Sequence, residues 1–201
     1  MKKRDRTNKL LKLAKGKRVF RVRDAREVGI HQEYVRRLYK EGVLERVGWG
    51  MYMLANADID EHQTMAEACK RVPEGVVCLL SALRYYGIGT QNPREVWIAI
   101  DRKARKPQFE YPPIRIARFS GRALHEGIET KDIGGVEVKV FNPAKTVVDC
   151  FKYRNKIGLD VALEALKECR RGQRCTMEDI VHYAKICRVF NVMRPYLESL
   201  S

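Results

Sequence analysis

Residues 31–54 read HQEYVRRLYKEGVLERVGWGMYML, and the pattern of this segment predicts how the N-terminal part of the chain folds. On a helix of about 3.6 residues per turn that begins near His31, Val35 and Leu38 share one face, while charged side chains occupy the opposite face. Gly42 is suited to end this helix, because glycine adopts a positive φ without strain. The pattern therefore predicts a charged, amphipathic helix.

Two short extended segments follow this helix. The first begins at residues 43–44, and residues 51–54, MYML, form the second. Between them, Gly48 and Gly50 favour a tight turn and place Trp49 at its tip. This arrangement predicts a small β-hairpin directly after the charged helix.

Two further helices are predicted upstream. The opening helix covers about residues 3–15, and its leucines, some or all of which are expected in the core, are Leu10, Leu11 and Leu13. A short helix over residues 24–28 has Ala25 and Val28 as its expected buried pair, and residues 29–30 turn into the charged helix. The order of these elements predicts a winged helix-turn-helix. In such a fold the charged helix enters the DNA major groove and the hairpin lies along the backbone or the minor groove.

Positive charge is concentrated in this predicted module. The chain contains 40 Lys and Arg against 25 Asp and Glu, a formal net charge of +15. Residues 1–55 hold 16 basic and 6 acidic side chains, a net of +10, whereas residues 56–201 hold 24 and 19, a net of +5. We interpret this asymmetry as a DNA-binding domain over residues 1–55. The alternative is that the charge only keeps the chain soluble.

The candidate DNA contacts are of two kinds. Gln32, Arg36 and Arg37 are expected to read base edges, since Gln pairs with adenine and Arg with guanine. The basic residues around them are expected to contact phosphates. The full candidate set is Lys15, Lys17, Arg18, Arg21, Arg23, Gln32, Tyr34, Arg36, Arg37, Lys40, Arg46 and Trp49. Two alternatives stay open: Glu33 pairs with Arg37 on a solvated helix face, and Trp49 packs onto the helices.

Residues 60–201 are predicted to form an α/β second domain, with a small sheet and a helical C-terminal half. The predicted strands are residues 93–100 and 114–119 and a hairpin over 128–141 that turns at Gly134 and Gly135. The predicted helices are residues 64–72, a short helix that ends at Gly87, residues 143–151, residues 159–172, one capped by Thr176 and Asp179, and a last segment after Pro195. The chain as a whole is therefore predicted to be α+β.

A basic, proline-rich loop joins the first two of these strands. Its cations are Arg102, Lys103, Arg105 and Lys106. Because unpaired charges are costly to bury, we expect the loop to be exposed and available to phosphate groups, on DNA beyond the wing or on RNA. The alternative is a solvated loop without a binding function.

Catalytic patterns are weak in this sequence. Two acid-x-Lys triplets, residues 101–103 and 137–139, fit the magnesium-binding triplet of restriction-type nucleases, and Glu137 and Lys139 share one side of a predicted strand. However, no acidic partner is clearly placed before either triplet, and such triplets arise by chance when 32% of residues are charged. The sequence also lacks a Gly-rich phosphate loop and a G-x-S-x-G motif. We predict a protein that is not an enzyme and has no cofactor, with a magnesium-dependent nuclease as a minor alternative.

The cysteines are predicted to be reduced thiols of a cytoplasmic protein, because they are scattered through periodic segments; they are Cys69, Cys78, Cys150, Cys169, Cys175 and Cys187. Zinc is a minor alternative for Cys169, Cys175, His182 and Cys187, whose spacings of six, seven and five lack tight C-x-x-C pairs. No metal site is therefore predicted. No apolar run approaches the roughly 20 residues of a membrane span, and the basic N-terminus lacks a signal core.

Four segments of this chain are similar, in order, to the AbiEi family of antitoxins, which are transcriptional regulators of type IV toxin–antitoxin systems. They are VRRLYKEGVLERVGWGMYML (35–54), LLSALRYYGI (79–88), VWIAI (96–100) and FNPAKTVVDCF (141–151), and the similarity extends over about residues 5–170. The sequence departs from the family pattern where the charged helix opens, because His31 stands where a small hydroxyl residue is frequent.

The resemblance implies a two-domain bacterial or archaeal regulator. Its first domain would bind double-stranded DNA at inverted repeats in its own promoter. Its antitoxin domain, residues 60–201, would counteract a nucleotidyltransferase-type toxin, through the toxin or its RNA substrate, directly or indirectly. One winged helix reads few base pairs, so we expect two monomers or a weak dimer on the DNA. A stand-alone winged-helix transcription factor without a toxin is the main alternative.

Overall fold

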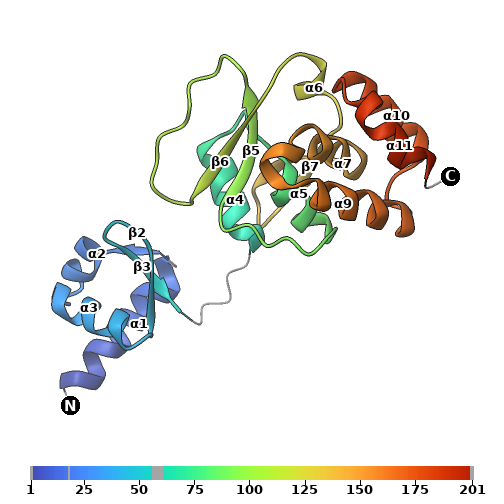
Figure 1. Ribbon diagram of the computed structural model, residues 1–201. Coiled ribbons are helices and arrows are strands. Elements are labelled where there is room, and N and C mark those ends of the chain that lie inside the picture. The colour runs from blue at the N-terminus through green and yellow to red at the C-terminus, as the bar shows by residue number, and fades with distance from the viewer. Residues whose placement is uncertain (1, 18, 56–60, 200–201) are drawn as a thin grey trace. The chain divides into compact units, whose positions relative to one another are not determined.

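The computed structural model describes residues 2–17, 19–55 and 61–199. The chain divides into two compact units, Met1–Ile59 and Asp60–Ser201, and each has its own core (Figure 1). Helices and small sheets occur in both units, so the predicted α+β class is confirmed. No helix within the described ranges is long and apolar enough to cross a membrane.

The first unit combines helices with a three-stranded antiparallel sheet. In chain order its elements are α1 (Lys2–Lys17), β1 (Phe20–Arg21), α2 (Val22–Glu27), α3 (Gln32–Lys40), β2 (Leu44–Gly48) and β3 (Met51–Leu54). The strand order is β1-β3-β2, with Phe20 opposite Tyr52 and Leu44 opposite Leu54. The helices and the hairpin are arranged as a winged helix-turn-helix, and β1 adds a third strand that the sequence did not predict.

The core of this unit receives buried side chains from its helices and strands, including Leu10, Phe20, Ala25, Ile30, Val35, Leu38, Leu44 and Tyr52. Leu11 and Leu13 are only half-buried. The prediction for Val28 is wrong, since this side chain is 39% exposed. The physical reason is that α2 begins two residues earlier than predicted, so Val28 is its C-cap and Ile30 enters the core instead.

Asp24 explains the early start of α2, because its Oδ2 accepts a hydrogen bond of 2.7 Å from the Arg21 N–H. Replacing Asp24 by Ala is expected to destabilise the first unit by about 1 kcal/mol, the usual cost of a lost helix cap. The Arg21 N–H and the Lys17 ammonium hold the pKa of Asp24 below its ordinary 3.8. The stability that the Asp24 carboxylate contributes is therefore present above pH 3.8 and is lost as the pH falls through the lower folded-state pKa of Asp24.

Urea unfolding followed by NMR signals of this unit tests that expectation. The difference between the parent protein and the Asp24→Ala variant should be present at neutral pH and should disappear once Asp24 is protonated. A difference that persists undiminished at acid pH would contradict the capping role.

The second unit is built around a five-stranded mixed sheet. Its elements are α4 (Glu61–Arg71), β4 (Val76–Val77), α5 (Leu79–Tyr86), β5 (Val96–Asp101), β6 (Ile114–Phe119), α6 (Arg122–His125), β7 (Ile128–Asp132), β8 (Glu137–Phe141), α7 (Pro143–Lys152), α8 (Arg154–Ile157), α9 (Leu159–Arg171), α10 (Met177–Ile186) and α11 (Phe190–Glu198). The strand order is β6-β5-β4-β8-β7. The strands predicted from the sequence are present, and the short central strand β4 was missed.

Both faces of this sheet are covered, which explains why residues 96–100 of β5 are all apolar. Val96, Ile98 and Ile100 belong to a buried cluster with side chains of α4. Trp97 and Ala99, which alternate with them along the strand, belong to a larger cluster on the opposite face with side chains of α5, α7, α9, α10 and α11. A strand that is buried on both faces reads as a continuous apolar run and not as an alternation.

Two predictions for the C-terminal half are wrong. The last helix begins at Phe190 and includes Pro195, because buried Met193 and Leu197 lie on both sides of this proline and pack into the core. Cys169 and Cys175 are joined in a disulfide, whereas reduced thiols were predicted. The chain reverses after α9, and the Arg174 N–H donates to the Cys169 carbonyl at 3.0 Å, which brings the two cysteines together.

Candidate nucleic-acid interface

The charged helix α3 is held by its apolar face and capped at both ends. Val35 and Leu38 are buried in the core of the first unit. His31 is the N-cap, and its Nδ1 accepts a hydrogen bond from the Glu33 N–H at 3.4 Å. His31 therefore takes the capping position itself, and Gly42 adopts φ +70° just beyond the helix. The polar face of α3 is therefore exposed to solvent.

Arg36 and Lys40 lie on that exposed face. The Arg36 side chain is 63% exposed and its Nη1 lies 3.0 Å from the Glu33 carboxylate. Lys40 is exposed as well. The pairing of Glu33 with Arg37, considered from the sequence, is not present, since Glu33 pairs with Arg36. Such an exposed pair contributes little stability and can open when a nucleic acid replaces the carboxylate.

Arg37 and Tyr34 form a connected pair on the side of α3. The Arg37 Cζ lies 4.5 Å from the centre of the Tyr34 ring, and the Arg37 Nε lies 3.6 Å from the Glu41 carboxylate. The Tyr34 hydroxyl is hydrogen-bonded to the Thr7 hydroxyl. Tyr34 thus connects α1 to α3 and provides the aromatic face on which Arg37 rests.

The Gln32 side chain is already engaged by a residue that sequence reasoning missed. The Arg26 Nη2 donates a hydrogen bond of 2.6 Å to the Gln32 Oε1. A bidentate contact with adenine uses both the oxygen and the amide nitrogen of Gln. Gln32 can therefore make that contact only if Arg26 moves to another acceptor, such as a phosphate.

The wing presents an aromatic side chain and a cation. Trp49, at the tip between β2 and β3, is 86% exposed, so it does not pack onto the helices. The Arg46 Nε donates to the Gly48 carbonyl at 3.1 Å, which fixes this guanidinium beside the tip. An exposed tryptophan next to a held arginine suits stacking or minor-groove contact with a nucleic acid.

The remaining basic candidates lie near the junction of α1 and α2. The Lys17 Nζ lies 3.0 Å from the Asp24 carboxylate, and Arg21 and Arg23 are exposed. Arg21 is opposite Met51 of the wing strand β3. Arg18 and the side chain of Lys15 lie outside the described residues.

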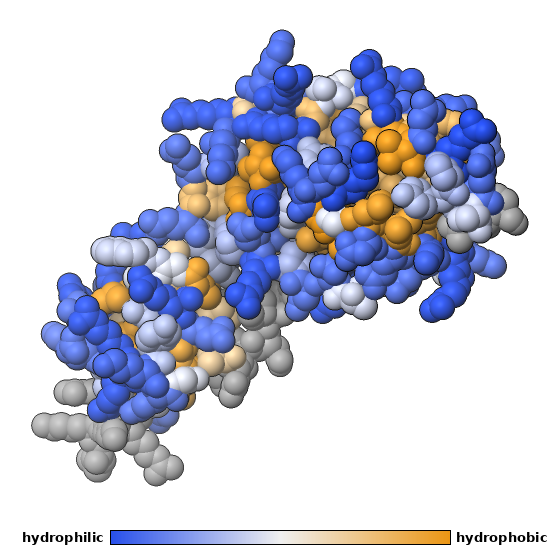
Figure 2. All heavy atoms as spheres, in the orientation of Figure 1, coloured by the Kyte–Doolittle hydropathy of each residue, from blue (hydrophilic) through white to orange (hydrophobic). Residues whose placement is uncertain are grey.

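The basic loop of the second unit is held in a defined conformation by one arginine. The Arg118 Nη1 donates to the carbonyl oxygens of Asp101 (2.9 Å), Arg102 (3.4 Å) and Ala104. The four loop cations Arg102, Lys103, Arg105 and Lys106 are all exposed. The loop between β5 and β6 can be followed in Figure 1. At the same place in Figure 2, hydrophilic side chains project from the second unit.

The acid-x-Lys triplets have structural partners. The Asp101 Oδ1 accepts from the Lys103 N–H at 2.8 Å within the loop turn. The Lys139 Nζ lies 3.8 Å from the Glu74 carboxylate and 3.4 Å from the Pro73 carbonyl. Across the part of the chain that the structure describes, no group of three or more His, Cys, Asp or Glu is placed to hold a metal ion.

The fold and this surface define a winged helix-turn-helix protein with a second α/β unit. Residues 8–55 match a family model described as "Transcriptional regulator, AbiEi antitoxin", which confirms the resemblance over the winged helix. The match supports a DNA-binding transcriptional regulator.

A crystal structure of the RV2827C protein from Mycobacterium tuberculosis is similar to this chain, with a TM-score of 0.53. The similarity covers 90% of this chain and 71% of that chain at 13% sequence identity, so it shows a related fold alone. No curated protein matches the sequence.

Proposed function

We propose that this protein represses transcription by binding inverted repeats in its own promoter through α3 and the wing. The observation that supports this proposal is the arrangement of Arg36, Lys40 and Gln32 on the outer face of α3 while Val35 and Leu38 anchor its inner face. The exposed Trp49 and Arg46 extend the same kind of surface onto the wing. Two copies on an inverted repeat, as monomers or a weak dimer, would supply the affinity that one winged helix lacks.

Replacing Arg36 by Ala is expected to weaken binding to the promoter duplex by about 1–3 kcal/mol, the usual value of a bidentate base contact. The loss on a duplex of random sequence should be smaller, because no base contact is lost there. Titration of both duplexes measures the difference. Arg194→Ala is the matched control, since Arg194 is a similarly exposed arginine in an i,i+4 pair, with Glu198. An equal loss on both duplexes would make Arg36 a phosphate contact.

We further propose that the second unit acts as an antitoxin domain, by binding and not by catalysis. This part of the proposal is supported by the family description over residues 8–55 and by the ordered basic loop, which offers exposed cations to a phosphate chain. The expected partner is a nucleotidyltransferase-type toxin or its RNA substrate. A nucleotidyltransferase gene beside this one would favour the antitoxin, and its absence would favour a stand-alone regulator.

Replacing Arg102, Lys103, Arg105 and Lys106 together by Ser is expected to abolish one of two activities, promoter affinity or rescue of growth when the toxin is expressed. Loss of affinity with intact rescue would make the loop an accessory DNA contact. Loss of rescue with intact affinity would place it in the neutralising surface. A variant with four other exposed cations of the same unit replaced by Ser, Lys70, Arg71, Lys167 and Arg194, controls for net charge. If the loop variant retains both activities, the loop has no binding function.

A further inference from the structure

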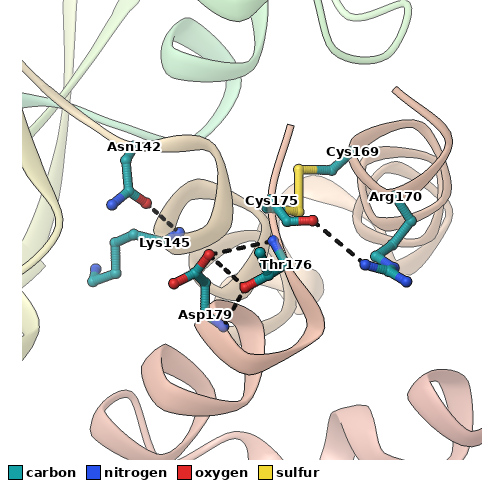
Figure 3. Close-up of a disulfide and its surroundings, with 7 residues drawn as sticks. All are labelled: Asn142, Lys145, Cys169, Arg170, Cys175, Thr176 and Asp179. Atoms are coloured by element: carbon teal, nitrogen blue, oxygen red, sulfur yellow. Dashed lines mark hydrogen bonds between the residues drawn. A yellow bond between two sulfur atoms is a disulfide. The ribbon is translucent and has the colours of Figure 1, made fainter. Parts of the chain in front are cut away.

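The segment CRRGQRC, residues 169–175, is an arginine-rich disulfide loop that begins in the last turn of α9 and ends before α10. The disulfide joins its two ends, whose Cα atoms lie 6.0 Å apart (Figure 3). Inside the loop, the Gln173 N–H donates to the Arg170 carbonyl at 3.1 Å, and the Arg170 Nη1 lies 3.5 Å from the Cys175 carbonyl. Beyond it, Thr176 and Asp179 cap α10. The loop is therefore fixed at both ends and across its middle.

A pocket of about 250 Å³ lies beside this loop, where it meets the end of α5. It is lined by Gly87, Ile88, Glu168, Arg171, Gly172 and Arg174. Ile88 is only 1% exposed and supplies an apolar surface. The Glu168 Oε2 accepts a hydrogen bond of 2.6 Å from the Gly89 N–H, which fixes the carboxylate. The pocket thus combines an apolar wall, a held carboxylate and two arginines.

The two pocket arginines are available to a ligand. Among the described residues, neither the Arg171 nor the Arg174 guanidinium has a hydrogen-bond or ion-pair partner, in contrast to that of Arg170. A Cβ built on Gly172 would lie 3.4 Å from the Arg174 Nε, so Arg174 folds back over the glycine beside the pocket. The partial negative charge at the C-terminus of α9 attracts cations, which would explain why an arginine, Arg171, lies in the last turn of this helix. It would not explain Arg174, which follows the helix.

We propose that this pocket binds a small organic acid, whose carboxylate or phosphate group is held by Arg171 and Arg174. Guanidinium groups suit this role because they bind such groups through two parallel hydrogen bonds. The second Glu168 oxygen would accept from a hydroxyl or amino group of the same ligand. The volume is below the roughly 300–1,000 Å³ of sites for drug-sized ligands, which indicates a small ligand. This site goes beyond the proposed function, since it requires no nucleic acid or toxin.

The disulfide supports ligand binding, because it restrains the segment that carries both arginines. Reduction by a dithiol such as dithiothreitol transfers two electrons and two protons to the bond, leaves two cysteine thiols and converts the reagent to its cyclic disulfide. The freed loop must then be ordered again on binding. Ordering costs of this kind reduce affinity.

NMR titration of the oxidised, ¹⁵N-labelled full chain tests the site, with glycerol 3-phosphate and malate as separate probes for phosphate and carboxylate. We expect at least one probe to cause saturable shifts of the Arg171 and Arg174 Nε–H signals and the Gly172 amide signal. The Arg171→Ser/Arg174→Ser variant should bind about tenfold more weakly or worse, as expected for lost charge-assisted hydrogen bonds. The Lys70→Ser/Arg194→Ser variant removes two exposed cations, on α4 and α11, that do not line the pocket and should bind like the parent.

Two results would overturn the proposal. One is the absence of saturable shifts with either probe at about 10 mM, where a site with a 1 mM dissociation constant would be largely filled. The other is equal weakening by the two double variants, which would show only a general effect of charge. Reduction with dithiothreitol should weaken binding about threefold or more, and an unchanged affinity would show that the disulfide does not contribute to binding. Because DNA is absent, these outcomes are independent of the proposed repressor function.

Discussion

Replacing Lys145 by methionine is expected to lower the free energy of unfolding of the second unit by about 3–5 kcal/mol. The side chains of Lys145 and Asp149 are both 0% exposed, and the Lys145 Nζ lies 2.6 and 2.7 Å from the two carboxylate oxygens. The ammonium also lies 4.0 Å from the centre of the Phe141 ring. The substitution leaves Asp149 buried without its cation, which is far more costly than the loss of an exposed ion pair.

The same variant should have a distinctive pH dependence. Burial raises the pKa of Asp149 from its ordinary 3.8, and Lys145 opposes this rise. Without Lys145 the folded-state pKa should rise further, so the folded variant favours the protonated acid. Relative to the parent protein, the variant is therefore most stable at acid pH. This relative stability is lost as the pH rises through the folded-state pKa of Asp149.

Urea unfolding at several pH values measures both effects. Lys167→Met is the matched control, since it replaces an exposed lysine and should change stability by less than about 0.5 kcal/mol. The double variant Lys145→Met/Asp149→Leu should recover much of the loss, because no charge is left unpaired. A loss below about 1 kcal/mol in the single variant would mean that water or another residue compensates Asp149.

Raising the salt concentration from about 50 to about 200 mM is expected to weaken promoter binding on the order of 10³-fold. If about six phosphates are neutralised, log affinity should fall with log salt at a slope near −5. The cations expected to produce this slope are Lys15, Lys17, Arg18, Arg21, Arg23 and Arg46. The Arg21→Ala/Arg23→Ala variant should make the slope shallower by about two units, one for each lost contact. A slope flatter than about −2 for the parent would indicate too few phosphate contacts.

Local patterns in the sequence predicted much of the fold. The bounds of α3 follow from helical periodicity and from Gly42, and the hairpin over residues 128–141 follows from alternation around a pair of glycines. The capping box of Thr176 and Asp179 was also recognised. These features depend on residues that are close in the chain, which is why a single sequence reveals them.

Contacts that depend on how the chain folds back on itself could not be predicted in the same way. Strands β1 and β4 have two residues each, too few for a periodic pattern, and exist because longer strands pair with them. The hydrogen bond of Arg26 with Gln32 and the contacts of Arg118 with the basic loop depend on how the chain folds back. The disulfide could be predicted only from the turn after α9, because a spacing of six residues is equally compatible with two free thiols.

Recognition of a specific DNA site by α3 and the wing can be measured by fluorescence anisotropy of the full chain with two labelled duplexes. One is the DNA immediately upstream of its gene, and the other has the same composition in shuffled order. At about 150 mM salt we expect the protein to bind the upstream duplex about 10³-fold more tightly, or more, than the shuffled one. Equal affinity for both duplexes, or no binding even at low salt, would contradict it.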